Sequence, residues 1–182
     1  MKGAIFIGFS EFVETKYGLT LWLQTVEACN LNSNGEYLST DLYDDAEFNT
    51  LIKQLSQRLT KPENELKREF GQHFFNTLMS IAKTHVENID NLFDFLIAVD
   101  KVIHIEVKKA DPLAYTPALF YDAPSEDVLV IRYSSKRKMC HFAEGLILGA
   151  ASYFNQEISL SQQVCMCKGD KHCLIKVTLI SH

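Results

Sequence analysis

The sequence lacks any apolar run long enough to cross a bilayer, and its first residues lack the basic, apolar and small-residue order of a signal peptide. We therefore expect a cytoplasmic protein with no membrane partner. An excess of positive charge is also missing, because 18 Lys and Arg stand against 23 Asp and Glu, for a net charge of −5. An acidic balance of this kind argues against a general affinity for nucleic acid.

Low-complexity segments and internal repeats are missing as well, so no compositional boundary divides the chain. A length of 182 residues suits one domain with a substantial core, and 47% hydrophobic with 23% charged residues is ordinary for a globular protein. We expect a single domain over 1–182, with a helical N-terminal part over 1–62 and a second part over 63–182. In a cytoplasmic protein, the five cysteines are more often thiols or metal ligands than disulfides.

In the N-terminal part, apolar residues recur at the spacing of amphipathic helices. Apolar residues recur at helical spacing up to Val13, and Gly18 is expected to end this first helix. Thr20 is predicted to cap a second helix, on which Cys29 belongs to the apolar stripe. The period from Phe48 to Leu59 is the cleanest in the chain and predicts a third helix.

Two longer helices are predicted next. Thr60 and Glu63 have the spacing of a capping box, which would begin a helix that runs through Leu78. The strongly apolar segment Leu92–Lys109 predicts one long helix. Pro112 explains where it ends, because the residue before a proline disfavours the helical conformation.

After this helix the period changes from helical to alternating. Ala118–Asp122 and Val128–Ser135 are predicted strands, Met139–Phe154 a helix, and the final segment a hairpin that turns at 168–170. The predicted fold is therefore of the α+β class. A helical N-terminal part would pack on a C-terminal part of helices and an antiparallel sheet.

The stretch IRYSSKRKMC, residues 131–140, holds four of the 18 basic residues. If the strand continues to Arg137, alternation places Tyr133, Ser135 and Arg137 on one face. All three side chains donate hydrogen bonds, and the guanidinium suits a carboxylate or phosphate. The alternative interpretation is a solvated edge strand without a ligand.

His104 lies on the predicted long helix among Val and Ile. It is either a hydrogen-bonded core histidine or a metal ligand. One imidazole cannot hold zinc alone, but it is enough for haem iron, because the porphyrin supplies four nitrogens. A haem also has an apolar body and two propionates, which would bind donors such as Tyr133, Ser135 and Arg137. The sequence therefore predicts a haem site.

The MKGAIF start, the Y-x-S-x-R pattern in YSSKRKM and the helical His104 together resemble the haem nitric oxide/oxygen binding domains, H-NOX. These domains are related to the sensor domain of soluble guanylate cyclase, and the resemblance covers essentially the whole chain. It implies a haem b between the two parts of the fold, with His104 as the proximal iron ligand. It also implies that Tyr133, Ser135 and Arg137 hold the propionates.

The resemblance extends to the surroundings of the porphyrin. Ile5 and Pro117 match positions that press on the porphyrin and distort it. Members that hold O2 have a tyrosine where this sequence has Phe142, and Phe9 and Phe74 match the other distal positions. Bound O2 carries partial negative charge and depends on a donor, whereas NO binds ferrous iron strongly without one. We therefore expect NO, and also CO, as the ligand.

The C-terminal cysteines form a second group that could bind a metal. The expected ligands of a tetrahedral zinc ion are Cys140, Cys165, Cys167 and Cys173. Cys165 and Cys167 would share one face of a strand, and the turn would bring Cys173 back toward them. Buried free thiols and a redox disulfide are alternatives, and His141 and His172 are alternate ligands. Some H-NOX domains have a similar zinc site near the C-terminus.

No kinase, cyclase or other output sequence is recognisable, so we expect a sensor and not an enzyme. It would bind NO at ferrous haem and regulate a separate signalling enzyme, which the resemblance implies is a histidine kinase or a cyclic-di-GMP enzyme. One alternative is a zinc and thiol redox sensor with haem as a second input. Another is a zinc-organised module without haem that binds nucleic acid through 136–138. A haem enzyme would need a distal acid or base.

Overall fold

The computed structural model of the chain describes residues 1–180, and of residues 106 and 110 it describes the backbone only. Its α-helices are α1 (Gly3–Tyr17), α2 (Leu19–Glu27), α3 (Asp45–Leu59), α4 (Glu63–Ala82), α5 (Leu92–Ala98), α6 (His104–Ala110) and α7 (Cys140–Tyr153). Its strands are β1 (Ala118–Ser125), β2 (Val128–Ser134), β3 (Ile158–Ser161) and β4 (Cys173–Leu179). Three short helical turns are η1 (Lys83–His85), η2 (Val99–Ile103) and η3 (Met166–Lys168). The predicted α+β class is confirmed.

The strands form one antiparallel sheet in the order β1-β2-β4-β3. Ile131 in the middle of β2 pairs with Tyr121 of β1 on one side and with Ile175 of β4 on the other. Because paired residues point to the same face of a sheet, these three side chains form a row across it. The row belongs to a buried cluster that also contains Phe95 of α5 and Ile147 of α7.

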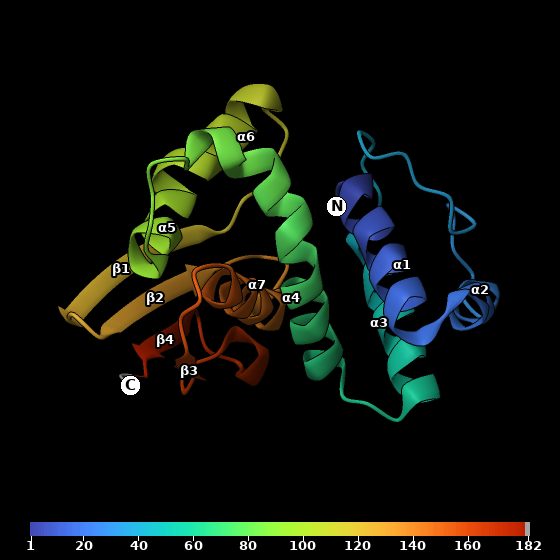
Figure 1. Ribbon diagram of the computed structural model, residues 1–182. Coiled ribbons are helices and arrows are strands. Elements are labelled where there is room, and N and C mark those ends of the chain that lie inside the picture. Colours follow the sequence, from blue (N-terminus) through green and yellow to red (C-terminus); the bar gives the residue numbers. More distant parts are fainter. Residues whose placement is uncertain (181–182) are drawn as a thin grey trace.

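Helix α4 runs through the middle of the molecule, with α1 to α3 on one side and the sheet on the other (Figure 1). It packs closely on α7 at two glycines. A Cβ atom on Gly71 would lie 2.2 Å from the Phe142 carbonyl oxygen, and one on Gly145 would lie 2.0 Å from the Arg68 carbonyl oxygen. Only residues without a side chain allow the two backbones to approach this closely.

Two clusters of buried side chains share α4. The N-terminal cluster joins α1, α2 and α3 to one side of α4, where Phe70 and Phe74 lie. The C-terminal cluster joins the sheet, α5 and α7 to the other side, where Phe75 and Met79 lie. Residues one position apart on a helix point in different directions, so a single helix can serve both cores.

Several predicted boundaries are wrong. Thr20 lies inside α2, which begins directly after Gly18 and has no side-chain cap. Thr60 ends α3 in a left-handed conformation with φ 52°, so it does not form a capping box with Glu63, and α4 begins behind Pro62. The predicted helix 92–109 exists but is interrupted by η2, a π-helical turn.

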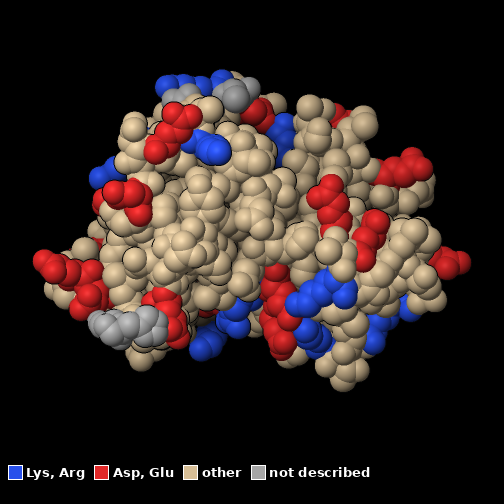
Figure 2. Space-filling model, viewed as in Figure 1, with Lys and Arg blue, Asp and Glu red and all other residues tan. Residues whose placement is uncertain are grey.

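The strand predictions also need correction. Strand β2 ends at Ser134, so Ser135 and Arg137 lie in the following turn and not on the strand. β3 and β4 do pair as antiparallel strands, but a long loop with η3 joins them, and Cys165 lies in this loop. Within residues 1–180, no helix combines the length and apolarity needed to span a membrane. In the view of Figure 2, charged side chains gather at the periphery and the middle of the face is nearly uncharged.

Candidate haem site

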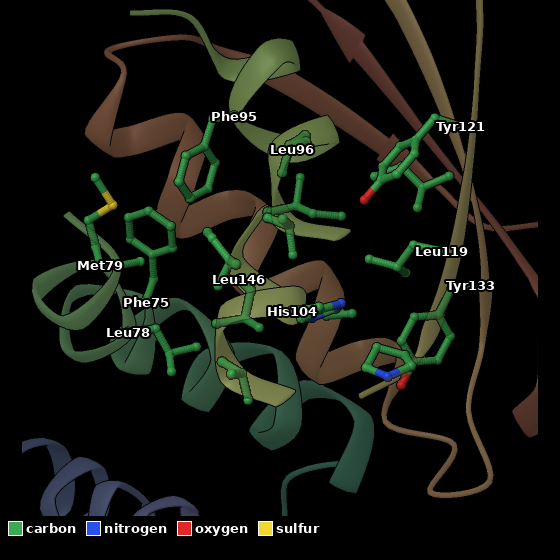
Figure 3. A pocket seen from close by; sticks show the side chains of 18 of the residues that line it. Phe75, Leu78, Met79, Phe95, Leu96, His104, Leu119, Tyr121, Tyr133 and Leu146 are labelled. Atoms are coloured by element: carbon green, nitrogen blue, oxygen red, sulfur yellow. The ribbon is translucent and has the colours of Figure 1, made fainter. Parts of the chain in front are cut away.

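A cavity of about 430 Å³ lies among α4, α7, the α5–η2–α6 segment and the sheet (Figure 3). This volume falls within the range of small-molecule and cofactor sites. Most of the side chains that line it are apolar, and the polar ones among the described residues are His85, His104, Tyr121 and Tyr133. Ile81 and Val107 line the cavity and are also exposed, so it reaches the surface between α4 and α6.

His104 lies at the junction of η2 and α6, and only 15% of its side chain is exposed. Its Nδ1 is 3.2 Å from Oδ1 of Asp100, one turn earlier. Burial holds the pKa of His104 below its usual value, against the opposing effect of the Asp100 hydrogen bond. A carboxylate only accepts, so Nδ1 carries the proton and the lone pair is on Nε2. This is the tautomer that a metal ligand needs.

Tyr133 and Ser135 are brought together as predicted, although by a strand end and a turn. Both are 4% exposed, and Tyr133 lines the cavity. Burial raises the pKa of Tyr133, against the opposing effect of a hydrogen bond with Ser135, so the phenol stays protonated and remains a donor. The Ser135 hydroxyl oxygen accepts the backbone N–H of Arg137 at 3.2 Å, which fixes the start of the turn.

Arg137 is half-buried and its guanidinium joins three parts of the chain. Its Nε donates to Oδ2 of Asp45 at 2.8 Å, and its Nη1 donates to the Tyr115 carbonyl oxygen at 3.4 Å. The amino group of Met1 lies 2.8 Å from Oδ1 of the same Asp45. Lys136 is exposed and its ammonium group lies 4.7 Å from the centre of the Tyr115 ring, and the guanidinium carbon of Arg137 lies 4.9 Å from the same centre. The two basic neighbours therefore share this ring but differ in exposure and in the contact with Asp45.

Pro117 lines the cavity, as the resemblance implied. Ile5, Phe9, Phe74 and Phe142 do not line it; they belong to the N-terminal cluster, in which the rings of Phe74 and Phe142 lie 6.2 Å apart. Ile5 and Phe9 lie on α1, and Phe74 and Phe142 lie on α4 and α7 within the same cluster. Their expected places around the porphyrin and the bound gas remain a prediction. The cavity itself lies within the part 63–182 and not between the two parts.

The walls that the sequence interpretation missed are Phe75, Leu78, Leu146 and Tyr121. Leu78 follows Phe74 at helical spacing, and the sequence alone does not show which of two neighbouring stripes faces which core. Tyr121 could have been found from strand alternation, because it lies two residues after Leu119, which also lines the cavity.

Candidate metal centre

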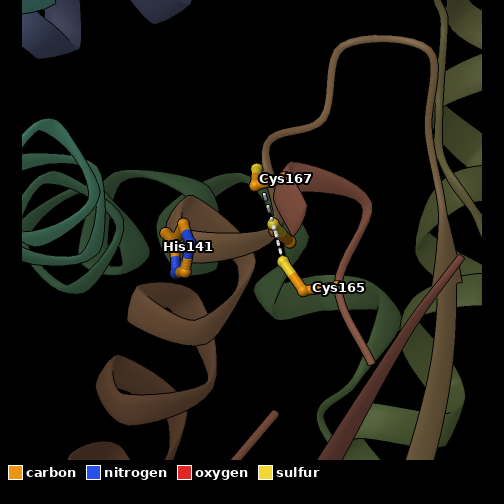
Figure 4. A group of neighbouring side chains, drawn as sticks. His141, Cys165 and Cys167 are labelled. Atoms are coloured by element: carbon orange, nitrogen blue, oxygen red, sulfur yellow. Dashed lines mark hydrogen bonds between the residues drawn. The ribbon is translucent and has the colours of Figure 1, made fainter. Parts of the chain in front are cut away.

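The C-terminal cysteines converge where α7 begins. Sγ of Cys140 is 3.6 Å from Sγ of Cys165 and 3.4 Å from Sγ of Cys167 (Figure 4). One ligand atom from each of these three and one from His141 lie within 4.8 Å of one another. Sulfurs that ligate one tetrahedral ion at about 2.3 Å lie roughly 4 Å apart. The observed cluster therefore needs only small movements to enclose a metal ion.

Cys173 is buried at the start of β4, beside this cluster. Its Sγ accepts the backbone N–H of Met166 at 3.2 Å, and its thiol also interacts with those of Cys140 and Cys165. Two groups can therefore supply a fourth ligand, Cys173 and His141. Neither Cys173 nor the other predicted alternate, His172, is in the group of ligand atoms that the described residues bring within 4.8 Å of one another.

The thiols differ in how easily they lose a proton. Burial acts to raise the pKa of Cys165, but hydrogen bonds from the Cys167 backbone and from the neighbouring thiols outweigh it and lower that pKa. Burial and the Cys140 thiol raise the pKa of Cys167 to about 12. Burial likewise raises the pKa of Cys173. Such a group of thiols without a cation holds protons that a metal ion would displace.

The family was identified by comparison with known proteins. A family model described as Haem-NO-binding matches residues 2–162. An H-NOX protein from S. oneidensis, solved in the Fe(II)NO state, is 31% identical over the full length of both chains, with a TM-score of 0.91. The unliganded Fe(II) H-NOX protein from K. algicida is 25% identical over 100% of this chain and 98% of that one, also with a TM-score of 0.91.

The S. oneidensis protein has also been solved by NMR in the Fe(II)CO state, with 31% identity and a TM-score of 0.88 to this chain. Among curated proteins, no sequence matches. The family match, the full-length structural similarity and the cavity with a histidine in its wall agree with one another. The chain belongs to the Haem-NO-binding family of H-NOX domains.

Proposed function

We propose that this chain is a haem-based sensor that binds NO at ferrous iron and regulates a separate signalling enzyme. The observation that carries the proposal is the apolar cavity with the buried imidazole of His104 in its wall. The cavity fits a haem because its walls are apolar and its few polar side chains include one that can ligate iron. When bound, the haem supplies an iron atom that reversibly binds a diatomic gas. His104 would present Nε2 to that iron.

The propionates would be bound by Tyr133, Ser135 and Arg137. Tyr133 reaches the cavity from β2. Ser135 and Arg137 lie in the turn that follows and are not among the residues that line the cavity. The Arg137 guanidinium has five N–H groups, and those to Asp45 and Tyr115 use two of them. The remaining donors can bind a carboxylate while the contact with Asp45 is retained.

The preference for NO over O2 rests on the wall formed by α4 and α7. Its lining side chains are Phe75, Leu78, Met79, Ile81, Ala82, Ala143, Leu146 and Ile147. None of these described side chains offers a hydroxyl or amide. On this wall O2 would lack a hydrogen-bond donor, whereas NO and CO do not depend on one. The hydroxyls of Tyr121 and Tyr133 enter the cavity from the sheet instead. Phe9, Phe74 and Phe142 remain the proposed distal residues.

Ile5 and Pro117 remain the side chains proposed to press on the porphyrin, with Pro117 in the cavity wall and Ile5 in the N-terminal cluster.

The signal from NO binding is proposed to regulate a separate protein, which is a histidine kinase or a cyclic-di-GMP enzyme. We propose one H-NOX domain over 1–182, acting in the cytoplasm without nucleic acid or membrane. H-NOX domains are sensors, so we propose no catalytic residue. In support, the S. oneidensis relative binds NO and CO in its solved structures.

We also propose that a structural zinc ion binds Cys140, Cys165, Cys167 and Cys173. Cys173 is the proposed fourth ligand because its thiol is buried and interacts with those of Cys140 and Cys165. His141 is the alternative fourth ligand: its Nδ1 lies 3.0 Å from Oε2 of Glu144, which is itself bound by Arg68 at 2.6 Å, and this leaves Nε2 available for a metal ion. A zinc-bound thiolate cluster of this kind could also respond to oxidants, which is the second candidate function.

The test of the haem assignment is His104→Gly, with His85→Gly as the matched control because His85 lines the same cavity. His104→Gly is expected to lose haem during purification and to recover a five-coordinate ferrous haem when imidazole is added. His85→Gly should keep its haem. Haem content is measured as the pyridine complex and coordination by visible absorption. Unchanged haem content and spectrum in His104→Gly would overturn the assignment.

A further inference from the structure

The helical segment that carries His104 has an unusual turn directly before it. In η2 the backbone N–H of His104 donates to the Val99 carbonyl oxygen, five residues back, where an α-helix would use the residue four back. Such turns inside helices often occur at functional sites. The wider turn places Asp100 so that its carboxylate lies 3.2 Å from Nδ1 of His104.

Tyr121 points toward this turn from the sheet. Its phenol is directed into the cavity in Figure 3, and its hydroxyl oxygen is buried. Burial and the negative charge of Asp100 raise the pKa of Tyr121, and a hydrogen bond with the Asp100 backbone opposes them. The phenol therefore lies beside the turn that carries Asp100.

We propose that Asp100 is a positioning residue for the iron ligand His104, and that Tyr121 supports the turn that carries it. This inference rests on the proposed haem function. The Asp100 carboxylate accepts the Nδ1 proton, which fixes the ring orientation and leaves Nε2 as the ligand atom. Partners of this kind also make the ligand nitrogen more basic, and their loss typically costs 10–100-fold in metal affinity.

Asp100 binds the His104 ring from one turn earlier, and its side chain is 39% exposed. Water can therefore reach the carboxylate, and the contribution should lie toward the lower end of that range. Tyr121 lines the cavity and interacts with Asp100. Removal of its hydroxyl should have a smaller effect, in the same direction.

The experiment uses the full chain loaded with haem, and compares wild type with Asp100→Asn, Asp100→Glu and Tyr121→Phe. Asp122→Asn is the control, because Asp122 is the exposed neighbour of Tyr121 on β1 and its replacement removes the same charge. The readouts are the iron–histidine stretching band in the resonance Raman spectrum of the ferrous protein and the rate of haem transfer to apomyoglobin.

Asp100→Asn should move the iron–histidine band to lower wavenumber and speed haem loss about tenfold. Tyr121→Phe should move the band less, Asp100→Glu should restore it, and Asp122→Asn should leave it unchanged. A wild-type band position in Asp100→Asn, while wild type holds haem through His104, would overturn the positioning role and leave the sensor function intact. A wild type that binds no haem would overturn the proposed function first, and this inference with it.

Discussion

His104 meets a different environment at each ring nitrogen. Nδ1 faces the Asp100 carboxylate, and the ring forms part of the cavity wall. Burial favours the neutral ring, and the carboxylate selects the tautomer. A histidine that only filled the core would need one partner and no cavity, so this combination supports the proposed role of His104 as an iron ligand.

Arg137 and Lys136 provide a comparison between neighbouring cations. We predict that Arg137→Ala weakens haem retention and that Lys136→Ala, the control, does not. The Arg137 side chain is half-buried and is proposed to bind a propionate, whereas Lys136 is exposed, although both cations lie over the Tyr115 ring. Loss of one charge-assisted hydrogen bond should cost on the order of 1.5–3 kcal/mol. Haem dissociation measured by transfer to apomyoglobin should therefore be roughly 10- to 100-fold faster. Equal rates for the two variants would contradict the propionate assignment.

The cysteine cluster gives a second prediction at this scale. Reduced protein purified without chelators should contain about one zinc per chain. Cys167→Ser and Cys173→Ser should each release it, because three ligands hold a structural zinc poorly, whereas His141→Ala should retain it. Metal content is measured by mass spectrometry. If His141→Ala releases zinc and Cys173→Ser does not, the imidazole is the fourth ligand; no zinc in wild type would leave the cysteines as thiols.

The helices show what residue patterns can predict. Two helices predicted from the spacing of apolar residues, one that ends at Gly18 and one from Phe48 to Leu59, are found as α1 and α3. A helix with one buried stripe requires apolar residues at this spacing. The caps at Thr20 and Thr60 were wrong because cap motifs are short and recur by chance. The π turn was not predictable, since it depends on one backbone bond and changes no residue type.

The proposed haem and metal sites were also predictable only in part from the sequence. Tyr133, Ser135, Arg137 and the cysteines could be proposed as ligand-binding residues from the sequence because their side-chain chemistry is distinctive. The walls on α4 and α7 could not, because Phe74 and Phe75 are equally apolar and only tertiary packing decides which of them faces the cavity. The cysteines converge although Cys165 lies in a loop, so the group was predicted for partly wrong reasons.

The contact between α4 and α7 gives a prediction at the scale of the element. Gly145→Ala should destabilise the protein by about 1–3 kcal/mol, because the new methyl group would overlap the Arg68 carbonyl oxygen. Thermal unfolding should detect a fall of roughly 2–4 °C for each kcal/mol. Asn76→Ala, at an exposed position of α4, is the control and should change stability by less than about 0.5 kcal/mol. An unchanged midpoint for Gly145→Ala would mean that the helices can separate at little cost.

At the scale of the molecule, two structures connect the N-terminal helices to the cavity. The first is α4, which contributes side chains to both clusters. The second is Asp45 at the beginning of α3, which binds both Arg137 and the amino group of Met1. A change at the haem can therefore reach α1 and α3 by two routes, one apolar and one ionic.

The stabilisation that the contacts of Asp45 give the protein should depend on pH. Hydrogen bonds from the Met1 amino group and Arg137 outweigh burial and lower the pKa of Asp45 below its usual 3.8. As pH falls, the unfolded chain takes up this proton first, so the stabilisation is complete above about pH 4 and is lost as pH falls through the lower folded-state pKa. Asp45→Asn should be less stable than wild type near neutral pH and should converge with it in acid. Urea unfolding at several pH values measures the difference in unfolding free energy between Asp45→Asn and wild type. A difference that stays constant at all pH values would contradict the prediction.

The same residue tests how a gas could become a signal. If NO binding shifts the balance between two arrangements of the N-terminal helices, it does so only by stabilising one of them, and the Arg137–Asp45 pair is one contact through which the arrangements can differ. In haem-loaded wild type, NO should change amide hydrogen exchange in α1 and α3 as well as around the cavity. Asp45→Asn should bind NO with an unchanged visible spectrum, because Asp45 does not line the cavity, but should show a smaller change in α1 and α3. Asp41→Asn, in the exposed loop before α3, is the control. Equal exchange changes in wild type and both variants would mean that the coupling runs through α4 alone.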